Sequence, residues 1–197
     1  YTLPTDETID FSVTPVGADK PVKIYSVGDN IEFFYAGAAE LTELTFTDCP
    51  KMKWIQFSHN NITNIDITQM PELLALNASY NNLTRVDISK CPKLQILNLK
   101  QNANLENISL ATCPDLEFVD FEDDKGINNV DVSMLPKLYH LGCENTSVYR
   151  IDVTNNPELK YLSCGYIPNL ASIDVTKNPK LEQLYISTKK PGMSRIS

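Results

Sequence analysis

The sequence predicts a parallel β-solenoid, in which successive coils of the chain stack on one another along a single axis. Prolines recur in it at intervals of 21 or 22 residues, at Pro50, Pro71, Pro92, Pro114, Pro136, Pro157 and Pro179. Apolar residues recur at the second, fifth and seventh positions after each proline, and the last two alternate as in a short strand. One coil cannot bury its apolar side alone, so neighbouring coils must stack to close the core.

The chain is expected to have three parts. Residues 1–40 lack the repeat and are expected to form a linker and a β-hairpin or small β-meander that caps the first coil. Residues 41–188 are expected to form about seven coils of the solenoid. Residues 189–197 are expected to be a polar tail without an apolar cap.

Local patterns place the strands within these parts. In the cap, three strands are predicted at 8–13, 22–27 and 31–36. In each coil, a short strand after the proline is followed by a turn and then by an extended rung that ends in a single tight turn.

The extended rungs carry an outward row of aspartates, interrupted by Ser109. The row consists of Asp66, Asp87, Asp131, Asp152 and Asp174. We expect each carboxylate to accept hydrogen bonds from the Thr or Ser two residues later or from turn amides. A calcium ladder is the alternative, but the turns are not rich in glycine.

The five cysteines are predicted to be free thiols that fill the core. Residues such as Met70 and Leu135 occupy the same repeat positions in other coils, which indicates that size and apolarity are what these positions need. No C-x-x-C pair occurs, and the chain has only two histidines, so no zinc site is predicted.

Two segments match the frame L-x-x-L-x-L-x-x-N-x-L: LLALNASYNNL at 73–83 and MKWIQFSHNNI at 52–62. Through this frame the chain resembles leucine-rich-repeat proteins. The short period of 21–22 residues makes it most similar to bacterial surface proteins of the internalin-like and gut-bacterial type. The resemblance implies a right-handed, β-rich leucine-rich-repeat solenoid with a parallel concave sheet and little helix, a class conventionally filed under α/β.

The resemblance also implies an asparagine ladder at the turn that follows each strand. The frame's asparagine is present as Asn60, Asn81 and Asn102, and is replaced from Asp124 onward. We therefore expect the later coils to turn differently.

The fourth residue after each proline is predicted to point outward, onto the surface that the resemblance identifies as concave. Large apolar or aromatic residues fill this position in most coils: Trp54, Ile96, Phe118, His140 and Tyr161. Tyr185 lies close by on the last strand. Contiguous exposed groups of this kind mark contact sites, so these residues are predicted to bind a ligand. The alternative is that the cap or a partner coil covers them.

A patch of carboxylates is predicted beside these rings. It comprises Asp120, Glu122, Asp123, Asp124 and Glu144. Such a patch favours attraction of a basic partner. The spacing of Asp120, Glu122 and Glu144 is also close to that of glycosidase carboxylate pairs. A shallow solenoid face offers no enclosed cleft, so we predict no catalytic residue, cofactor or metal.

The predicted function is that of a non-enzymatic binding module that recognises an unidentified protein through the strand face. A net charge of −8 argues against nucleic acid as a partner. The first alternative is a glycan-binding protein that stacks sugars on Trp54, Phe118 and Tyr161, and a remote alternative is a glycoside hydrolase.

Location is predicted from the resemblance and from the start of the chain. No apolar run approaches the roughly 20 residues that span a bilayer. The chain begins at Tyr1, which we interpret as a trimmed product whose signal has been removed. The resemblance implies an extracytoplasmic location: at the cell surface, anchored to the outer membrane as a lipoprotein, or secreted.

Overall fold

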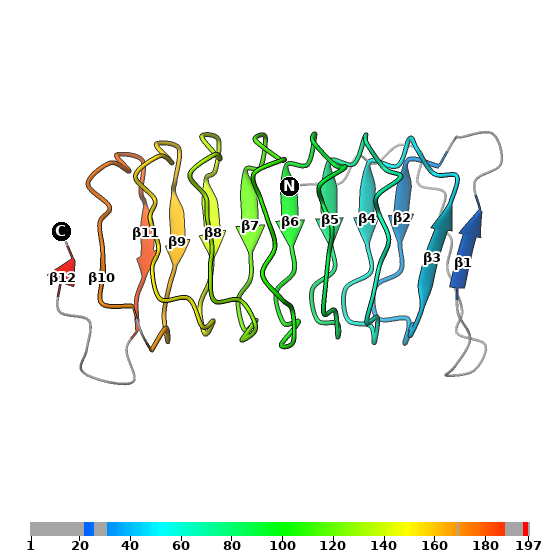
Figure 1. Cartoon of the computed structure of the whole chain (residues 1–197), viewed down its shortest axis with the longest axis horizontal. Helices are drawn as coiled ribbons and strands as arrows, with labels where there is room; N and C mark the ends of the chain where they lie inside the picture. The colour runs from blue at the N-terminus through cyan, green and yellow to red at the C-terminus, as the bar shows by residue number, and fades with distance from the viewer. Residues whose placement is uncertain (1–21, 26–30, 169, 188–194, 197) are drawn as a thin grey trace.

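The computed structural model describes residues 22–25, 31–168, 170–187 and 195–196. These residues form a solenoid whose coils lie side by side along one axis (Figure 1). Its short strands are β1 (Val22–Tyr25), β2 (Phe33–Tyr35), β3 (Leu44–Thr47), β4 (Trp54–Gln56), β5 (Ala75–Asn77), β6 (Ile96–Asn98), β7 (Phe118–Asp120), β8 (His140–Gly142), β9 (Tyr161–Ser163), β10 (Ser172–Ile173), β11 (Gln183–Tyr185) and β12 (Arg195–Ile196). Within this part of the chain there is no helix, and so none that could cross a membrane.

Eight of the strands form one parallel sheet, in the order β11-β9-β8-β7-β6-β5-β4-β2. The register pairs the fifth residue after one proline with the fifth after the next, as in Ile55 with Leu76 and Leu76 with Leu97. The remaining strands form two small parallel sheets, β1 with β3 and β10 with β12. The predicted leucine-rich-repeat solenoid with a parallel sheet is confirmed.

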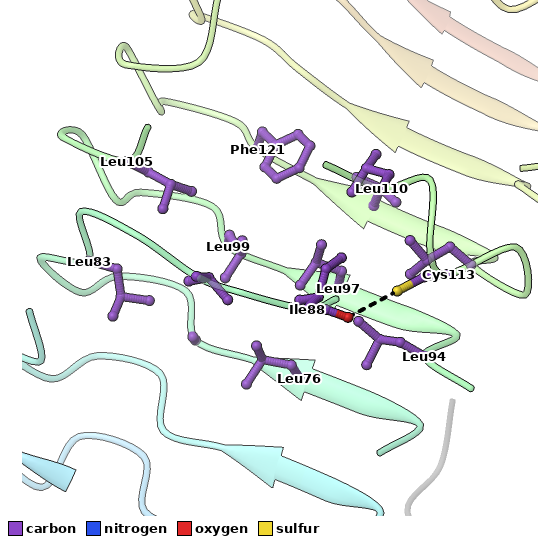
Figure 2. Packing of buried hydrophobic residues seen from close by; sticks show 14 of the residues in the cluster. Leu76, Leu83, Ile88, Leu94, Leu97, Leu99, Leu105, Leu110, Cys113 and Phe121 are labelled. Carbon is purple, nitrogen blue, oxygen red and sulfur yellow. Dashed lines mark hydrogen bonds between the residues drawn. The ribbon is translucent and has the colours of Figure 1, made fainter. Parts of the chain in front are cut away.

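The core is a continuous column of apolar side chains between the strands and the rungs. Leu76, Leu97 and Leu141 are all 0% exposed at the centres of their strands. Figure 2 shows the strand residue Leu97 close to the rung residue Ile88. Burying each such side chain contributes about 1.5–3 kcal/mol, so the repeated apolar positions account for the fold.

The five cysteines are buried and none forms a disulfide, and the prediction that they fill the core is confirmed. Cys113 Sγ donates to the Cys91 carbonyl at 3.3 Å and to the Ile88 carbonyl at 3.6 Å, the contact drawn in Figure 2. Burial raises the pKa of the Cys91 thiol to about 12. Such thiols are poor nucleophiles, so their role is structural.

The predicted asparagine ladder is confirmed in the first half of the solenoid. The Asn102 amide donates to the carbonyls of Leu99 at 2.6 Å and Ala78 at 3.1 Å, and its oxygen accepts from Leu83 N at 2.9 Å. Asn60 and Asn81 make equivalent bonds. Each asparagine thereby ties its own turn to the turn of the preceding coil.

The prediction that later coils turn differently is confirmed, although one feature of the backbone is retained. The residue before the ladder position has a left-handed conformation in both halves, with φ of 55° at Tyr80 and 53° at Asn145. The side chains differ, because the Asp124 carboxylate accepts from Asn102 N and the Thr146 hydroxyl donates to the Cys143 carbonyl at 2.7 Å. The left-handed residue is therefore kept, while the turn at Asp124 also makes backbone hydrogen bonds, from Asp124 N to Phe121 O and from Ile127 N to Asp124 O, both at 3.1 Å.

The row of aspartates on the rungs is held by local hydrogen bonds, as predicted. Asp66 Oδ1 accepts from the Thr68 hydroxyl at 2.7 Å and from Thr68 N at 2.9 Å, and Asp174 does the same with Thr176. These bonds lower the pKa of both carboxyls. A correction concerns the end of each rung, where two successive turns, not one, lead into the strand: Met70 N donates to Ile67 O and Leu73 N to Met70 O.

The N-terminal hairpin or meander is also corrected by the strand pairing. β1 pairs in parallel with β3 of the next coil, and β2 pairs in parallel with β4, so β1 and β2 do not pair with each other. The reason lies in IEFFYAGAAEL at 31–41, which repeats the apolar spacing of the coils without their proline. The predicted strand at 8–13 lies outside the described residues.

The other chain end differs from its prediction in one respect. Residues 195–196, assigned to the polar tail, form β12 and pair in parallel with β10. In the last coil Leu181, Leu184 and Ile186 are only partly buried, unlike their equivalents in the central coils. The division into cap, solenoid and tail as separate domains stays a prediction.

Candidate functional site

The candidate site is the outer face of the eight-stranded sheet, which we call the strand face. Parallel register aligns the first residues of the strands in one row, the ring row: Phe33, Trp54, Ala75, Ile96, Phe118, His140, Tyr161 and Gln183. The third residues of the strands form a second, more polar row: Tyr35, Gln56, Asn77, Asn98, Asp120, Gly142, Ser163 and Tyr185. Residues between the two rows point into the core, so the inferred inward and outward alternation holds.

The ring row is half-buried. Trp54, Ile96, Phe118, His140 and Tyr161 are each neither sealed in the core nor fully exposed. They shield one another because neighbouring strands lie only about 4.8 Å apart. Phe33 extends the row by one coil and was missed, because the reading of the sequence counted from prolines and its coil has none.

Three rings of the row stack face to face. The ring centres of Phe118 and His140 are 4.1 Å apart, and those of His140 and Tyr161 are 4.4 Å apart, with interplanar angles of 14° and 2°. Both faces of His140 are therefore covered, and the stack is flanked in register by Ile96 beside Phe118 and by Gln183 beside Tyr161. Sugars bind aromatic residues through ring faces, so the stack weakens the glycan alternative at its centre.

The imidazole of His140 is neutral at physiological pH. Burial between its neighbours lowers the pKa of His140 to about 4. Its Nε2 atom is buried and has no hydrogen-bond partner among the residues that the structure describes. The ring therefore acts as an apolar spacer in the stack.

Asp120 lies in the second row and leans over Gly142 on the next strand. It is only 8% exposed, and Glu122 N donates to its Oδ1 atom at 2.9 Å. Burial raises the pKa of Asp120 to about 6. A Cβ atom at position 142 would lie 2.7 Å from the Asp120 Cγ atom, so glycine is required there to make room for the carboxylate.

Three more carboxylates surround Asp120, and we call the four together the acidic patch: Asp120, Glu122, Asp123 and Glu144. Glu122 forms an ion pair with Lys100 at 2.7 Å, and Glu144 accepts from the Ser163 hydroxyl at 3.0 Å.

Asp123 at the edge of the patch accepts from the Asn145 amide at 2.6 Å. Asp124 was also predicted to belong to this surface, and that assignment is wrong. It is 0% exposed, because it occupies the inward ladder position.

Tyr185 borders the acidic patch. Its ring covers Gly165, where a Cβ atom would lie 2.8 Å from the Tyr185 Cε1 atom. The pKa of Tyr185 is raised, first by Tyr166 and then by Glu144. The structure thus brings together the predicted site residues from Phe118 to Tyr185 at β7–β11, with Ile96 beside Phe118 on β6 and Trp54 two strands further on, on β4.

The arrangement suits contact with a macromolecule better than catalysis. Two surface grooves in the described part of the chain lie on the rungs, one lined by residues such as Asn107 and Met134, the other by Tyr149 and Asp174. The same part of the chain holds no cluster of His, Cys, Asp and Glu placed to bind a metal ion. The raised pKa of Asp120 has a structural cause, because its carboxyl is packed against the backbone of Gly142.

Comparisons with known proteins agree on the fold. The leucine-rich repeat domain of APL1B aligns with a TM-score of 0.56 and 19% identity, covering 84% of this chain and 59% of that one. An internalin, InlF from Listeria monocytogenes, aligns with a TM-score of 0.50 and 17% identity, covering 75% and 53%. The functional domain of InlJ from the same species has a TM-score of 0.45 and 22% identity, covering 85% and 45%.

This chain therefore spans about half the length of the leucine-rich-repeat structures that it matches. No protein-family model matches it, and neither does any curated protein. Identities below a quarter carry the fold and nothing more, and the likeness to InlJ is too loose to add to it. The chain has the leucine-rich-repeat fold.

Proposed function

We propose that this protein is a non-enzymatic binding module that recognises a protein partner through the strand face. The observation that carries the proposal is the ring row, in which Phe33, Trp54 and the run from Ile96 to Tyr161 are half-buried apolar or aromatic side chains, on a chain with net charge −8. Lines of this kind are uncommon on free surfaces and typical of contact sites. A broad, open sheet face suits another protein better than an enclosed small substrate.

The stacked rings also favour tight binding. Phe118, His140 and Tyr161 hold one another in place, so little side-chain freedom is lost when a partner covers them. The polar second row and the acidic patch would form the rim of the interface. An extracytoplasmic location accompanies this proposal, and its support is the short repeat period shared with bacterial surface proteins.

Affinity capture with matched variants tests the proposal. Immobilised protein would be exposed to extracts and to extracellular proteins, and the capture repeated with Tyr161→Ala and Tyr149→Ala. Tyr149 is 62% exposed and lies on a rung, outside the sheet, so it controls for loss of any surface tyrosine. We expect bound proteins to disappear with Tyr161→Ala and to remain with Tyr149→Ala.

Three outcomes contradict the proposal. Equal capture by both variants would show that the ring row is not the binding face. Binding to a glycan array that is lost in Trp54→Ala would favour the sugar alternative. Hydrolysis of an aryl glycoside that is abolished by Glu122→Gln would show an enzyme.

A further inference from the structure

Resting on the proposed function, we propose that the partner presents a basic segment containing arginine to the acidic patch and Tyr185, at the β7–β11 end of the strand face. Support for this partner has three parts: the charges left unpaired on this face, the position of the Asp120 carboxylate, and the geometry that arginine offers.

The first part is the contrast in charge pairing. Acidic side chains on the edges of the coils form ion pairs one coil apart, such as Glu72 with Lys93 at 2.5 Å and Glu158 with Lys180 at 2.6 Å. Within the acidic patch only Glu122 has such a partner, Lys100. The hydrogen bonds of Asp120, Asp123 and Glu144 come from neutral groups among the described residues. The patch thus carries uncompensated negative charge.

The second part is the position of Asp120. Its Oδ1 atom is occupied by Glu122 N, while no group of the described chain donates to its Oδ2 atom. Although Asp120 is only 8% exposed, its Oδ2 atom is not one of the buried side-chain atoms left without a partner, so this oxygen reaches the surface and can accept from a donor there. Because it leans over Gly142, the carboxylate lies beside the strand that leads directly to Glu144. A cation on this face can therefore meet both carboxylates.

The third part is the fit of arginine. Its planar guanidinium donates through five N–H groups and can bridge two carboxylates, whereas lysine offers a single charged point. Guanidinium planes also stack on aromatic rings, and Tyr185 is 45% exposed beside the patch. Apolar residues flanking the arginine in the partner would contact the neighbouring ring row.

The experiment is a selection from a phage-displayed library of random 12-residue peptides against the whole chain. The same selection is run against a double variant, Asp120→Asn with Glu144→Gln, which keeps side-chain size. The control is Asp131→Asn with Asp174→Asn, which removes the same charge from the exposed rung row. Thermal unfolding followed by circular dichroism checks that all three proteins fold. If Asp120→Asn prevents the double variant from folding, the single variant Glu144→Gln takes its place.

We expect the peptides selected on the unchanged chain to be rich in arginine. Their affinity should fall at least fivefold in the Asp120→Asn, Glu144→Gln variant, be nearly unchanged in the control, and weaken as salt rises. Selected peptides that are not enriched in basic residues would overturn the inference. An equal loss of affinity in the control would also overturn it, because it would show a response to net charge alone.

The two proposals fail in different ways. Selected peptides that depend on Tyr161 but carry no basic residues would keep the binding face and overturn the basic partner. Arginine-rich peptides that depend on the acidic patch but ignore Tyr161→Ala would support the basic partner and contradict the ring row as the binding face.

Discussion

The two halves of the solenoid have the same coil, but their buried asparagines stabilise different turns of it. In the first half, Asn60, Asn81 and Asn102 cap the turn after each strand. In the second half the ladder asparagine is gone, and Asn156 and Asn178 cap the turn before the proline. The Asn156 amide donates to Val132 O at 2.9 Å and to Leu135 O at 2.8 Å.

The comparison teaches that the apolar positions, not the asparagine, define the coil. Sheet register and the left-handed turn residue continue unchanged across the switch. Buried backbone carbonyls need hydrogen-bond donors. A side chain at the turn after the strand or at the turn before the proline can supply such a donor. In the first half, sulfur-containing side chains precede the proline: Cys49, Met70, Cys91 and Cys113. Of these, Cys113 makes a weak hydrogen bond to the Cys91 carbonyl.

The largest effect should come from the core and be equal in both halves. Leu97→Ala and Leu141→Ala each remove a side chain that is 0% exposed, so each should lower the free energy of unfolding by about 2–5 kcal/mol. Urea denaturation followed by circular dichroism measures both. If the loss in free energy of unfolding differed widely between the two variants, the core would not stabilise the two halves equally.

The ladder substitutions should cost no more than the core substitutions and should differ from each other. Asn102→Ala leaves three backbone groups without their partner and should cost about 3–4 kcal/mol. Asn156→Ala removes two hydrogen bonds and also a buried oxygen that has no partner, so about 1–3 kcal/mol is expected. The same urea titrations compare them, with exposed Asn61→Ala as the control.

Asp124 marks the junction between the halves and should make stability depend on pH. Burial raises its pKa from an ordinary value of 3.8 to about 9. The folded chain therefore keeps a proton that the unfolded chain releases, so the contribution of Asp124 to stability is full below about pH 4 and is lost as pH rises toward 9. Asp120 acts in the same direction, with its pKa raised to about 6, so the window from pH 6 to 9 belongs to Asp124.

Asp124→Asn should remove the decline in stability between pH 6 and 9. The amide supplies the donor that ladder asparagines use and should raise stability at pH 7 by about 1–2 kcal/mol. Melting temperatures across this pH range are the measurement. Asp131→Asn is the matched control, because the pKa of Asp131 is lowered by its hydrogen bonds with Ser133. An unchanged slope in Asp124→Asn would mean that Asp124 is ionised in the fold.

The smallest effect is expected at the strand face. Ile96→Ala removes a half-buried side chain next to Leu97 and should cost less than about 1 kcal/mol. A loss as large as that of Leu97→Ala would reverse the inward and outward assignment of the whole sheet.

Much of the fold could be predicted because its signal is periodic. Apolar residues at fixed distances from each proline determine which side chains enter the core, and the prediction at Leu76, Leu97 and Leu141 holds at each strand. The first coil was missed because IEFFYAGAAEL lacks the proline. Asn156 and Asn178 were missed because a polar residue before a proline resembles an ordinary turn residue.

The candidate site could be predicted only in part. Strand alternation was enough to place Phe118, His140 and Tyr161 outward in one row. It could not show that their rings stack, because stacking depends on side-chain rotamers. It also placed Asp124 on the surface, because the sequence does not reveal that an aspartate can take the inward position of an asparagine.

The most direct test of the account is photocrosslinking from single positions on the intact chain. A photoreactive phenylalanine would replace Phe118 on the strand face in one protein and Tyr149 on a rung in another. The account predicts partner crosslinks from position 118 and none from 149. Crosslinks from 149 alone, or equally from both, would contradict recognition through the strand face.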